Sequence, residues 1–91
     1  MEVKHAVVVA KQHVSDLFAP EDITNVGLEE IEFDEKRDDW QVAIGFARPW
    51  DGQGTFAAAA GLARRRTYKI VVISDASGHV LAVRHRALAQ H

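Results

Sequence analysis

The sequence contains no cysteine. A disulfide framework, a thiolate nucleophile and a cysteine-ligated zinc site are therefore excluded. Long apolar runs are also missing, because the longest one near the N-terminus extends only from Ala6 to Ala10 before Lys11 interrupts it. That length is too short for the core of a signal peptide and for a membrane span. We therefore predict a cytoplasmic protein that does not associate with a membrane.

Motifs for catalysis and metal binding are scarce. No two of the five histidines have the H-x-x-x-H or H-E-x-x-H spacing of a zinc site. The only serines are Ser15, Ser74 and Ser77, and none lies in a G-x-S-x-G nucleophile elbow. The sequence therefore predicts no catalytic residue and no metal site.

The overall composition is that of a folded domain. Hydrophobic residues make up 47% of the 91 residues and charged residues 26%, which is close to the averages for globular proteins. A chain of this length can build only one hydrophobic core. We predict a single α+β domain over residues 1–91, with a C-terminal tail at about 87–91.

The N-terminal segment has the periodicity of a helix. Its apolar residues recur at steps of three and four, which places them on one helical stripe. They are Val3, Ala6, Val7, Ala10, Val14, Leu17 and Phe18. Pro20 disfavours the α conformation at Ala19, so we expect the helix to end near Phe18.

Two strands are expected next. In residues 26–35, Val26 and Leu28 alternate in one phase and Ile31 and Phe33 in the other, which predicts a β-bulge near Glu29 or Glu30. Residues 40–47 then alternate without interruption. The side chains expected to share one face are Trp40, Val42, Ile44 and Phe46.

Residues 67–74 and 79–86 are the third and fourth predicted strands. Asp75 and Gly78 between them suit a type I turn closed by a glycine bulge. Only the connection between the second and third strands, at about 48–66, is long. One helix and four strands joined in this way predict an antiparallel sheet with the helix packed on its apolar face.

The long connection contains a weak phosphate-binding motif. Residues 52–57 match the G-x-G-x-x-A pattern of dinucleotide-binding folds, in which a pyrophosphate lies at a helix N-terminus. That fold requires several parallel βαβ units, which a chain beginning with a helix and ending in a hairpin does not supply. We therefore expect no cofactor.

Two interpretations of residues 48–66 remain. Glycine and alanine offer little apolar surface to offset the entropy of ordering, which favours a flexible loop. Alternatively, the segment binds a partner, with Trp50 and Phe56 as apolar anchors and Arg64, Arg65 and Arg66 facing an acidic surface. These five are the candidate partner-binding residues.

The net charge of −2 conceals a polarised chain. Residues 29–39 carry seven acids against Lys36 and Arg37, whereas residues 64–91 carry six Lys or Arg against Asp75. We interpret this as acidic and basic strands that lie side by side in the sheet and pair. A nucleic-acid surface usually combines a basic chain with several aromatic residues, and only Tyr68 is near, so we do not expect nucleic acid as a partner.

Residues 67–86, TYKIVVISDASGHVLAVRHR, resemble the C-terminal half of a PepSY-like module, in which a strand leads through an Asp-x-x-Gly turn into another strand. The strand WQVAIGF and the N-terminal helix complete a similar order. The resemblance implies a small non-catalytic α+β module, many of which are extracytoplasmic and thought to regulate proteases. The missing export signal and the long 48–66 segment depart from that family, and cystatin-like domains give much the same pattern.

We therefore predict a small binding or regulatory module, not an enzyme, that acts on another protein through its sheet face or the 48–66 loop. The alternative is a small-ligand-binding or catalytic protein with a site between this loop and the sheet, using Trp50, the arginines and His79 or His85. A homodimer is a further possibility, because Val8 and Val9 lie off the helical stripe and an uncovered strand edge can pair with its copy.

Overall fold

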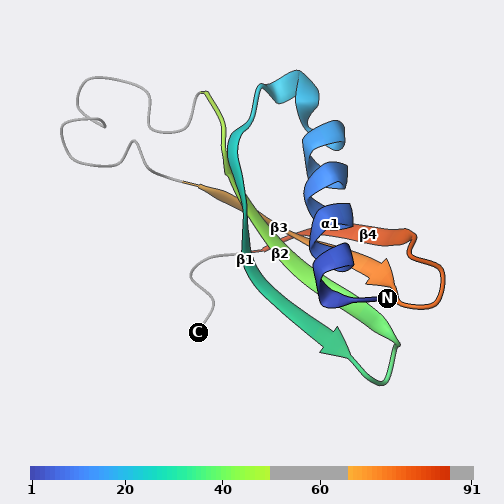
Figure 1. Ribbon diagram of the computed structural model, residues 1–91. Coiled ribbons are helices and arrows are strands. Elements are labelled where there is room, and N and C mark those ends of the chain that lie inside the picture. The colour runs from blue at the N-terminus through green and yellow to red at the C-terminus, as the bar shows by residue number, and fades with distance from the viewer. Residues whose placement is uncertain (50–65, 87–91) are drawn as a thin grey trace, which may run out of the picture.

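The computed structural model describes residues 1–49 and 66–86. It contains one N-terminal helix packed on a four-stranded antiparallel sheet (Figure 1). The elements are α1 (Val3–Leu17), the 3-10 helix η1 (Ala19–Glu21), β1 (Thr24–Asp34), β2 (Asp39–Ala47), β3 (Thr67–Ser74) and β4 (Val80–His85). The predicted α+β class and the long connection between the second and third strands are confirmed. The predicted tail at 87–91 and most of the predicted flexible loop lie outside the described residues.

Helix α1 ends where Pro20 requires. Its last regular residue is Leu17, and the Phe18 amide still donates to the Val14 carbonyl at 3.0 Å. Pro20 lies in the first turn of η1, and Asp22 then takes a left-handed conformation with φ 53°. This left-handed residue turns the chain back toward the sheet. The predicted end of the helix near Phe18 is confirmed.

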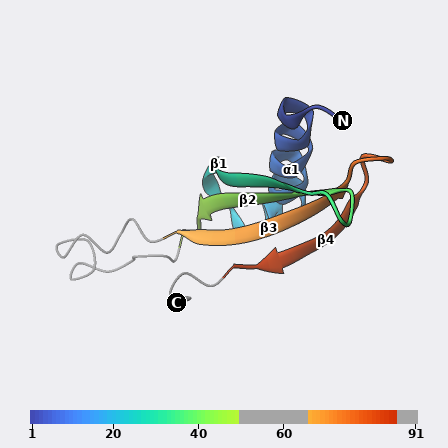
Figure 2. The same ribbon diagram turned by 90° about the horizontal axis from the view of Figure 1, so that it is seen from below.

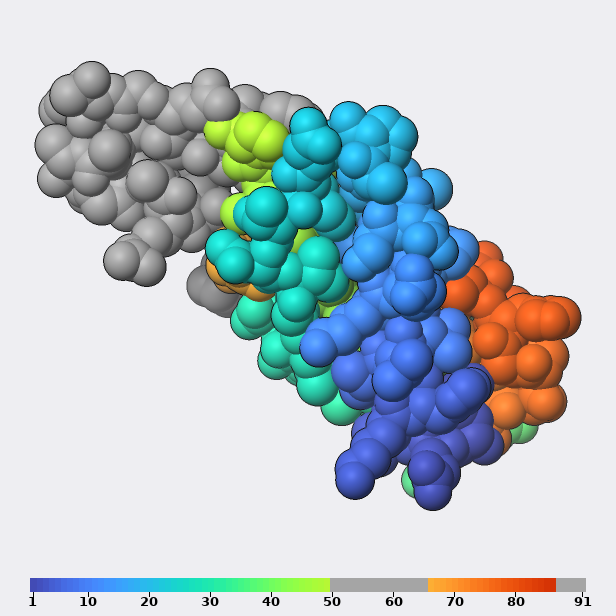
Figure 3. Space-filling view, turned by 45° about the horizontal axis from the view of Figure 1, so that its top comes forward, coloured from blue at the N-terminus to red at the C-terminus, as the bar shows by residue number. Residues whose placement is uncertain are grey.

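The buried part of the helical stripe is narrower than the sequence indicates. Ala6, Ala10 and Val14 are fully buried at steps of four. The stripe is exposed at both ends, since Val3 is 46% and Leu17 is 52% exposed. In Figure 3 the helix forms a ridge between β1 and the β3–β4 hairpin. The predicted stripe is therefore correct in phase at Ala6, Ala10 and Val14, and Phe18 also packs against the core, whereas Val3 and Leu17 are about half exposed.

The strands lie in the order β1-β2-β3-β4, and each neighbouring pair is antiparallel. On the side facing α1, Val42 lies opposite Val71 and Trp40 opposite Ile73. The predicted alternation of β2 is confirmed, because its even-numbered residues face the core. The hydrophobic cluster is completed by Ala6, Ala10, Val14, Ile44, Phe46 and partly buried neighbours.

Strand β1 contains the predicted β-bulge. Leu28 pairs with Ile44, but Glu30 pairs with Ala43, so Glu29 is the extra residue. Leu28 and Ile31 are three positions apart, so they would lie on opposite faces of a regular strand. The extra residue lets both of them lie on the helix side. The same shift sends the carboxylate of Glu30 to the opposite face.

The predicted pairing of acidic and basic strands is wrong. The acidic strand β1 and the basic strand β4 are the two edges of the sheet, with β2 and β3 between them. The sequence gives the charge of each segment but not which strands become neighbours. Ion pairs between the two groups do form, and they cross the middle strands.

A carboxylate holds together the end of the molecule where the chain starts. Asp75 Oδ1 accepts a hydrogen bond of 2.9 Å from Trp40 Nε1 and lies 3.3 Å from the Met1 ammonium. The hydrogen bond from Trp40 is the largest of the causes that lower the pKa of Asp75 from its ordinary 3.8. In the same β3–β4 turn, Gly78 has a φ of 74° and donates to the Ser74 carbonyl at 2.8 Å. Gly78 therefore has the left-handed conformation that the predicted glycine bulge requires. Its amide bonds to Ser74, whereas the predicted type I turn over residues 75–78 would pair it with Asp75.

Truncation of Val14 tests the packing of α1. We expect Val14→Ala to lower the free energy of unfolding by about 2–3 kcal/mol, because it removes two buried methyl groups and leaves a cavity. Val8→Ala is the matched control on the same helix, since Val8 is 62% exposed, and it should change stability by less than about 0.5 kcal/mol. Urea denaturation measures both, and equal losses would contradict the assigned helix face.

The carboxylate of Asp75 should make stability depend on pH. Its folded pKa is lowered, so the charged form stabilises the fold above the unfolded pKa, and this contribution is lost as pH falls through the folded pKa. We expect Asp75→Asn to be less stable than the wild type at pH 7 and the difference to shrink as pH falls below 3.8. Urea denaturation between pH 7 and pH 3 tests this, with the exposed Glu35→Gln as control. A difference that is constant over pH would contradict it.

Candidate functional site: the open face of the sheet

Helix α1 covers one face of the sheet, and no helix or strand of residues 1–49 and 66–86 covers the other (Figure 2). We call this second surface the open face. The strand registers and bulge place on it Glu29, Glu30, Glu32 and Asp34 from β1; Gln41, Ala43 and Gly45 from β2; Tyr68, Ile70 and Val72 from β3; and Ala82, Arg84 and Arg86 from β4 and its end.

The centre of the open face is apolar and closely surrounded by longer side chains. Ala43 is only 4% exposed and Val72 only 3%. Ala43 shares a small hollow with Glu30, Glu32, Gln41 and Ile70. Polar side chains from the flanking strands therefore enclose an apolar floor, over which the described helices and strands place no second layer.

Three shallow hollows adjoin along this face and form one groove. The first, of about 520 Å³, lies at the β1–β2 hairpin, and it shares Glu32 and Gln41 with the small hollow beside Ala43. The third, of about 300 Å³, shares Glu30 with the second and is lined also by Glu29, Tyr68 and Arg86. The groove thus runs from the β1–β2 hairpin to Arg86, which directly follows the C-terminal end of β4.

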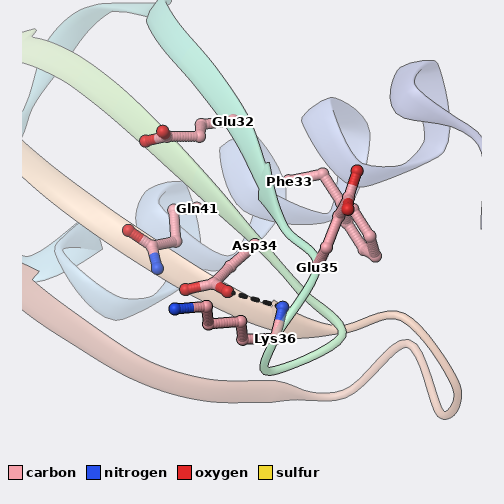
Figure 4. Close-up of a pocket in the computed structure, with 6 residues that line it drawn as sticks. All are labelled: Glu32, Phe33, Asp34, Glu35, Lys36 and Gln41. Atoms are coloured by element: carbon pink, nitrogen blue, oxygen red, sulfur yellow. Dashed lines mark hydrogen bonds between the residues drawn. The ribbon is translucent and has the colours of Figure 1, made fainter.

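Figure 4 shows how the hairpin end of the groove is built. Glu32, Asp34 and Gln41 point to one side of the strands, and Phe33 points to the other. Phe33 packs on Trp40 with 5.0 Å between ring centroids. The Asp34 carboxylate accepts hydrogen bonds from the backbone amides of Lys36 and Arg37 at 3.0 and 3.2 Å. Asp34 therefore stabilises the β1–β2 turn and also faces the groove.

Two ion pairs cross the open face. Arg86 Nη2 lies 2.9 Å from Glu30 Oε1, although the residues belong to opposite edges of the sheet. Arg66 Nη2 lies 3.5 Å from Glu29 Oε2 and donates to the Asn25 carbonyl at 2.9 Å. Both arginines therefore extend over the middle strands toward β1.

Gly45 makes room for one of these pairs. A Cβ atom on Gly45 would lie 2.9 Å from Arg66 Nη2 and 3.0 Å from both Glu29 Oε2 and Tyr68 Cε1. The absence of a side chain at this position therefore lets the Arg66–Glu29 pair rest directly on the sheet.

The remaining charges of the face are separated by edge. Glu32 on β1 and Arg84 on β4 are both exposed, and neither has an ion-pair partner within the described part of the chain. As far as the described residues go, one edge thus presents an acid without an ion-pair partner and the other a base without one, with Ala43 and Ile70 between them.

Of the predicted partner-binding residues, only Arg66 lies in the described part of the chain. It is on the open face, but its guanidinium already contacts Glu29 and Asn25. Trp50, Phe56, Arg64 and Arg65 lie outside the described residues. His85 of the alternative site pairs with Lys69 on the helix side of the sheet, so it does not join the groove.

Sequence reasoning missed Arg48 as a packing residue. Its guanidinium lies 5.3 Å from the Phe46 ring centroid and 5.8 Å from that of Phe18, and its Nε lies 2.6 Å from Glu21 Oε1. Arg48 therefore covers the end of the core.

Sequence reasoning also missed the groove, although charges at every second position indicate one charged face. These charges are Glu30, Glu32 and Asp34 on β1, and Arg84 and Arg86 on β4 and its end.

Within residues 1–49 and 66–86, no group of three or more His, Cys, Asp or Glu side chains is arranged to hold a metal ion. None of the helices in these ranges has the length and hydropathy that crossing a bilayer requires. No family model, curated protein or solved structure matches the chain. The resemblance to PepSY-like and cystatin-like domains therefore stays a prediction.

Alanine at two paired glycines tests the space above the sheet. Gly27 pairs with Gly45, but a Cβ on Gly27 would meet only Arg66 Nη2 at 3.8 Å, an ordinary contact. We expect Gly27→Ala to stabilise the fold by about 0.4–1 kcal/mol through the unfolded state, and Gly45→Ala to lose this gain because it displaces Arg66 and Glu29. Urea denaturation and the Arg66 Nε–Hε resonance measure both effects. Identical behaviour of the two variants would contradict the described position of Arg66.

Proposed function

We propose that the protein is a small non-catalytic binding module that holds another protein on its open face. The observation that carries the proposal is a groove lined by charged side chains of both signs, whose middle hollow also has the apolar residues Ala43 and Ile70 in its lining. Protein interfaces combine an apolar centre with a polar rim in this way.

The shape of the groove favours a protein over a small molecule. Pockets for small ligands bury most of the ligand surface, whereas the two larger hollows are open to solvent and the middle one holds only about 40 Å³. A sheet face that no described helix or strand covers fits a partner surface of similar extent. The alternative, a ligand-binding or catalytic site between the 48–66 loop and the sheet, has no comparable support, because His85 lies on the other side of the sheet from Arg66.

The helix side of the molecule carries scattered exposed apolar residues. They are Val3, Val8 and Leu17 of α1 and Leu28 of β1, and single exposed apolar residues are ordinary on protein surfaces. A regulatory role, with a protease as one class of partner, follows only from the PepSY-like resemblance. A cytoplasmic location follows only from the sequence-based prediction.

Affinity capture from a lysate of the source organism tests the binding face. The baits are the wild type, Ile70→Lys on the open face, Val8→Lys on α1 as the matched control, and a variant whose residues 51–63 are replaced by a Gly-Ser linker. We expect a protein that the wild type and Val8→Lys recover to be lost with Ile70→Lys, because the substitution puts a longer, charged side chain where the partner's apolar surface would lie, and burying that charge costs free energy.

Thermal melting curves first confirm that each bait is folded, and quantitative mass spectrometry compares the recovered proteins. Equal recovery by Ile70→Lys and the wild type would contradict the open face as the binding site. Loss with the linker variant alone would move the site to the 48–66 segment.

A further inference from the structure

The open face sets strict demands on what can cover it. Glu32 on β1 and Arg84 on β4 lie at opposite edges, and neither has an ion-pair partner among residues 1–49 and 66–86. A wholly basic partner would meet Arg84 and Arg86, and a wholly acidic partner would meet Glu32 and Asp34. The best partner therefore presents a base at one edge, an acid at the other and apolar surface between them.

The open face itself has this pattern. We propose that the protein covering the open face is a second copy of this chain, packed open face to open face. The proposal rests on the proposed function, because it names the partner of the same surface. Aligned sheet-on-sheet packing, with an angle of about 30° between the two sets of strands, is a common arrangement for sheets that share a core.

Charge selects one of the two symmetric ways to stack the sheets. With a two-fold axis parallel to the strands, β1 lies over the partner's β4, so acids face bases at both edges. With an axis across the strands, β1 lies over the partner's β1, and acidic residues face acidic residues. Like charges brought together in an interface are costly, so the parallel axis is favoured.

Side-chain size selects the same axis. The register places Glu30, Ala43, Ile70 and Arg84 in one row across the four strands. The parallel axis brings β3 over the partner's β2, so Ile70 lies over the partner's Ala43, and the reciprocal contact forms by symmetry. The other axis would stack Ile70 on its own copy and Ala43 on its own copy. Large against small fills space better than like against like.

The same arrangement brings the two unpaired charges together. Arg84 of each chain lies over the row of Glu30 in the other chain. Glu32 is the next residue of β1 on the open face after Glu30. The long arginine side chain covers this offset. Each dimer then contains two Glu32–Arg84 pairs, one at each edge.

Charge reversal and charge exchange test the arrangement. Glu32→Arg and Arg84→Glu should each raise the dissociation constant of the dimer by about tenfold or more, because each substitution places two like-charge pairs in the interface. An equimolar mixture of the two variants should form dimers again, since both contacts are then attractive. The double variant should dimerise alone for the same reason. Both residues are exposed, so the fold is retained, and thermal melting checks it.

Sedimentation equilibrium over a range of concentrations gives the masses. We expect the wild type to approach the mass of two 10.1 kDa chains. A wild type that stays at 10.1 kDa overturns the proposal, as does a dimer that neither reversal weakens or a mixture that does not recover. The proposed function fails separately. A monomeric wild type with a lysate partner that Ile70→Lys loses refutes only the second copy, whereas Ile70→Lys without effect on either dimer or capture refutes the open face altogether.

Discussion

One helix can cover only one face of a four-stranded sheet, and the rest of the molecule depends on this shortage of covering surface. The contact that α1 does make is close, because Ala6 and Ala10 at its centre have almost no side chain. Small residues at the contact bring the helix axis near β2 and let Val14 and Phe46 complete the core. The hydrophobic stabilisation is therefore concentrated on one side of the sheet, and the apolar residues on the other side need a different kind of cover.

Long charged side chains cover part of the open face. Glu30 and Arg86 are both substantially exposed, so their ion pair contributes only about 0–1 kcal/mol by itself. Its larger effect is geometric, because the aliphatic stem of an arginine covers apolar surface while its charge stays in water. The pair thus shields an apolar floor in the free chain. Side chains held only by weak ion pairs can also be displaced when another surface covers the same floor.

Periodic patterns in the sequence predict the fold class and the individual elements. The 3.6-residue repeat from Val3 to Phe18 gave the helix and Pro20 its end, and the phase change between Leu28 and Ile31 gave the bulge. The site was much less accessible. Which strands are neighbours depends on the complete chain path, so the partners Glu30 and Arg86 could not be paired from local pattern. Trp40 and Asp75 meet across 35 residues for the same reason, and charge by segment led to the wrong neighbours for β1.

The position of the long connection has a consequence for how the sequence can change. Residues 48–66 join β2 to β3 at a point where Phe46 and Thr67 already face each other across the ladder, and Arg48 Nη1 donates to Thr67 Oγ1 at 3.1 Å. Joining two ends that the sheet already fixes costs entropy that grows only with the logarithm of length, about 0.6 kcal/mol for each doubling. Insertions, deletions or even a whole inserted domain therefore cost least here, so this end of the sheet is where relatives of the chain should differ most in length.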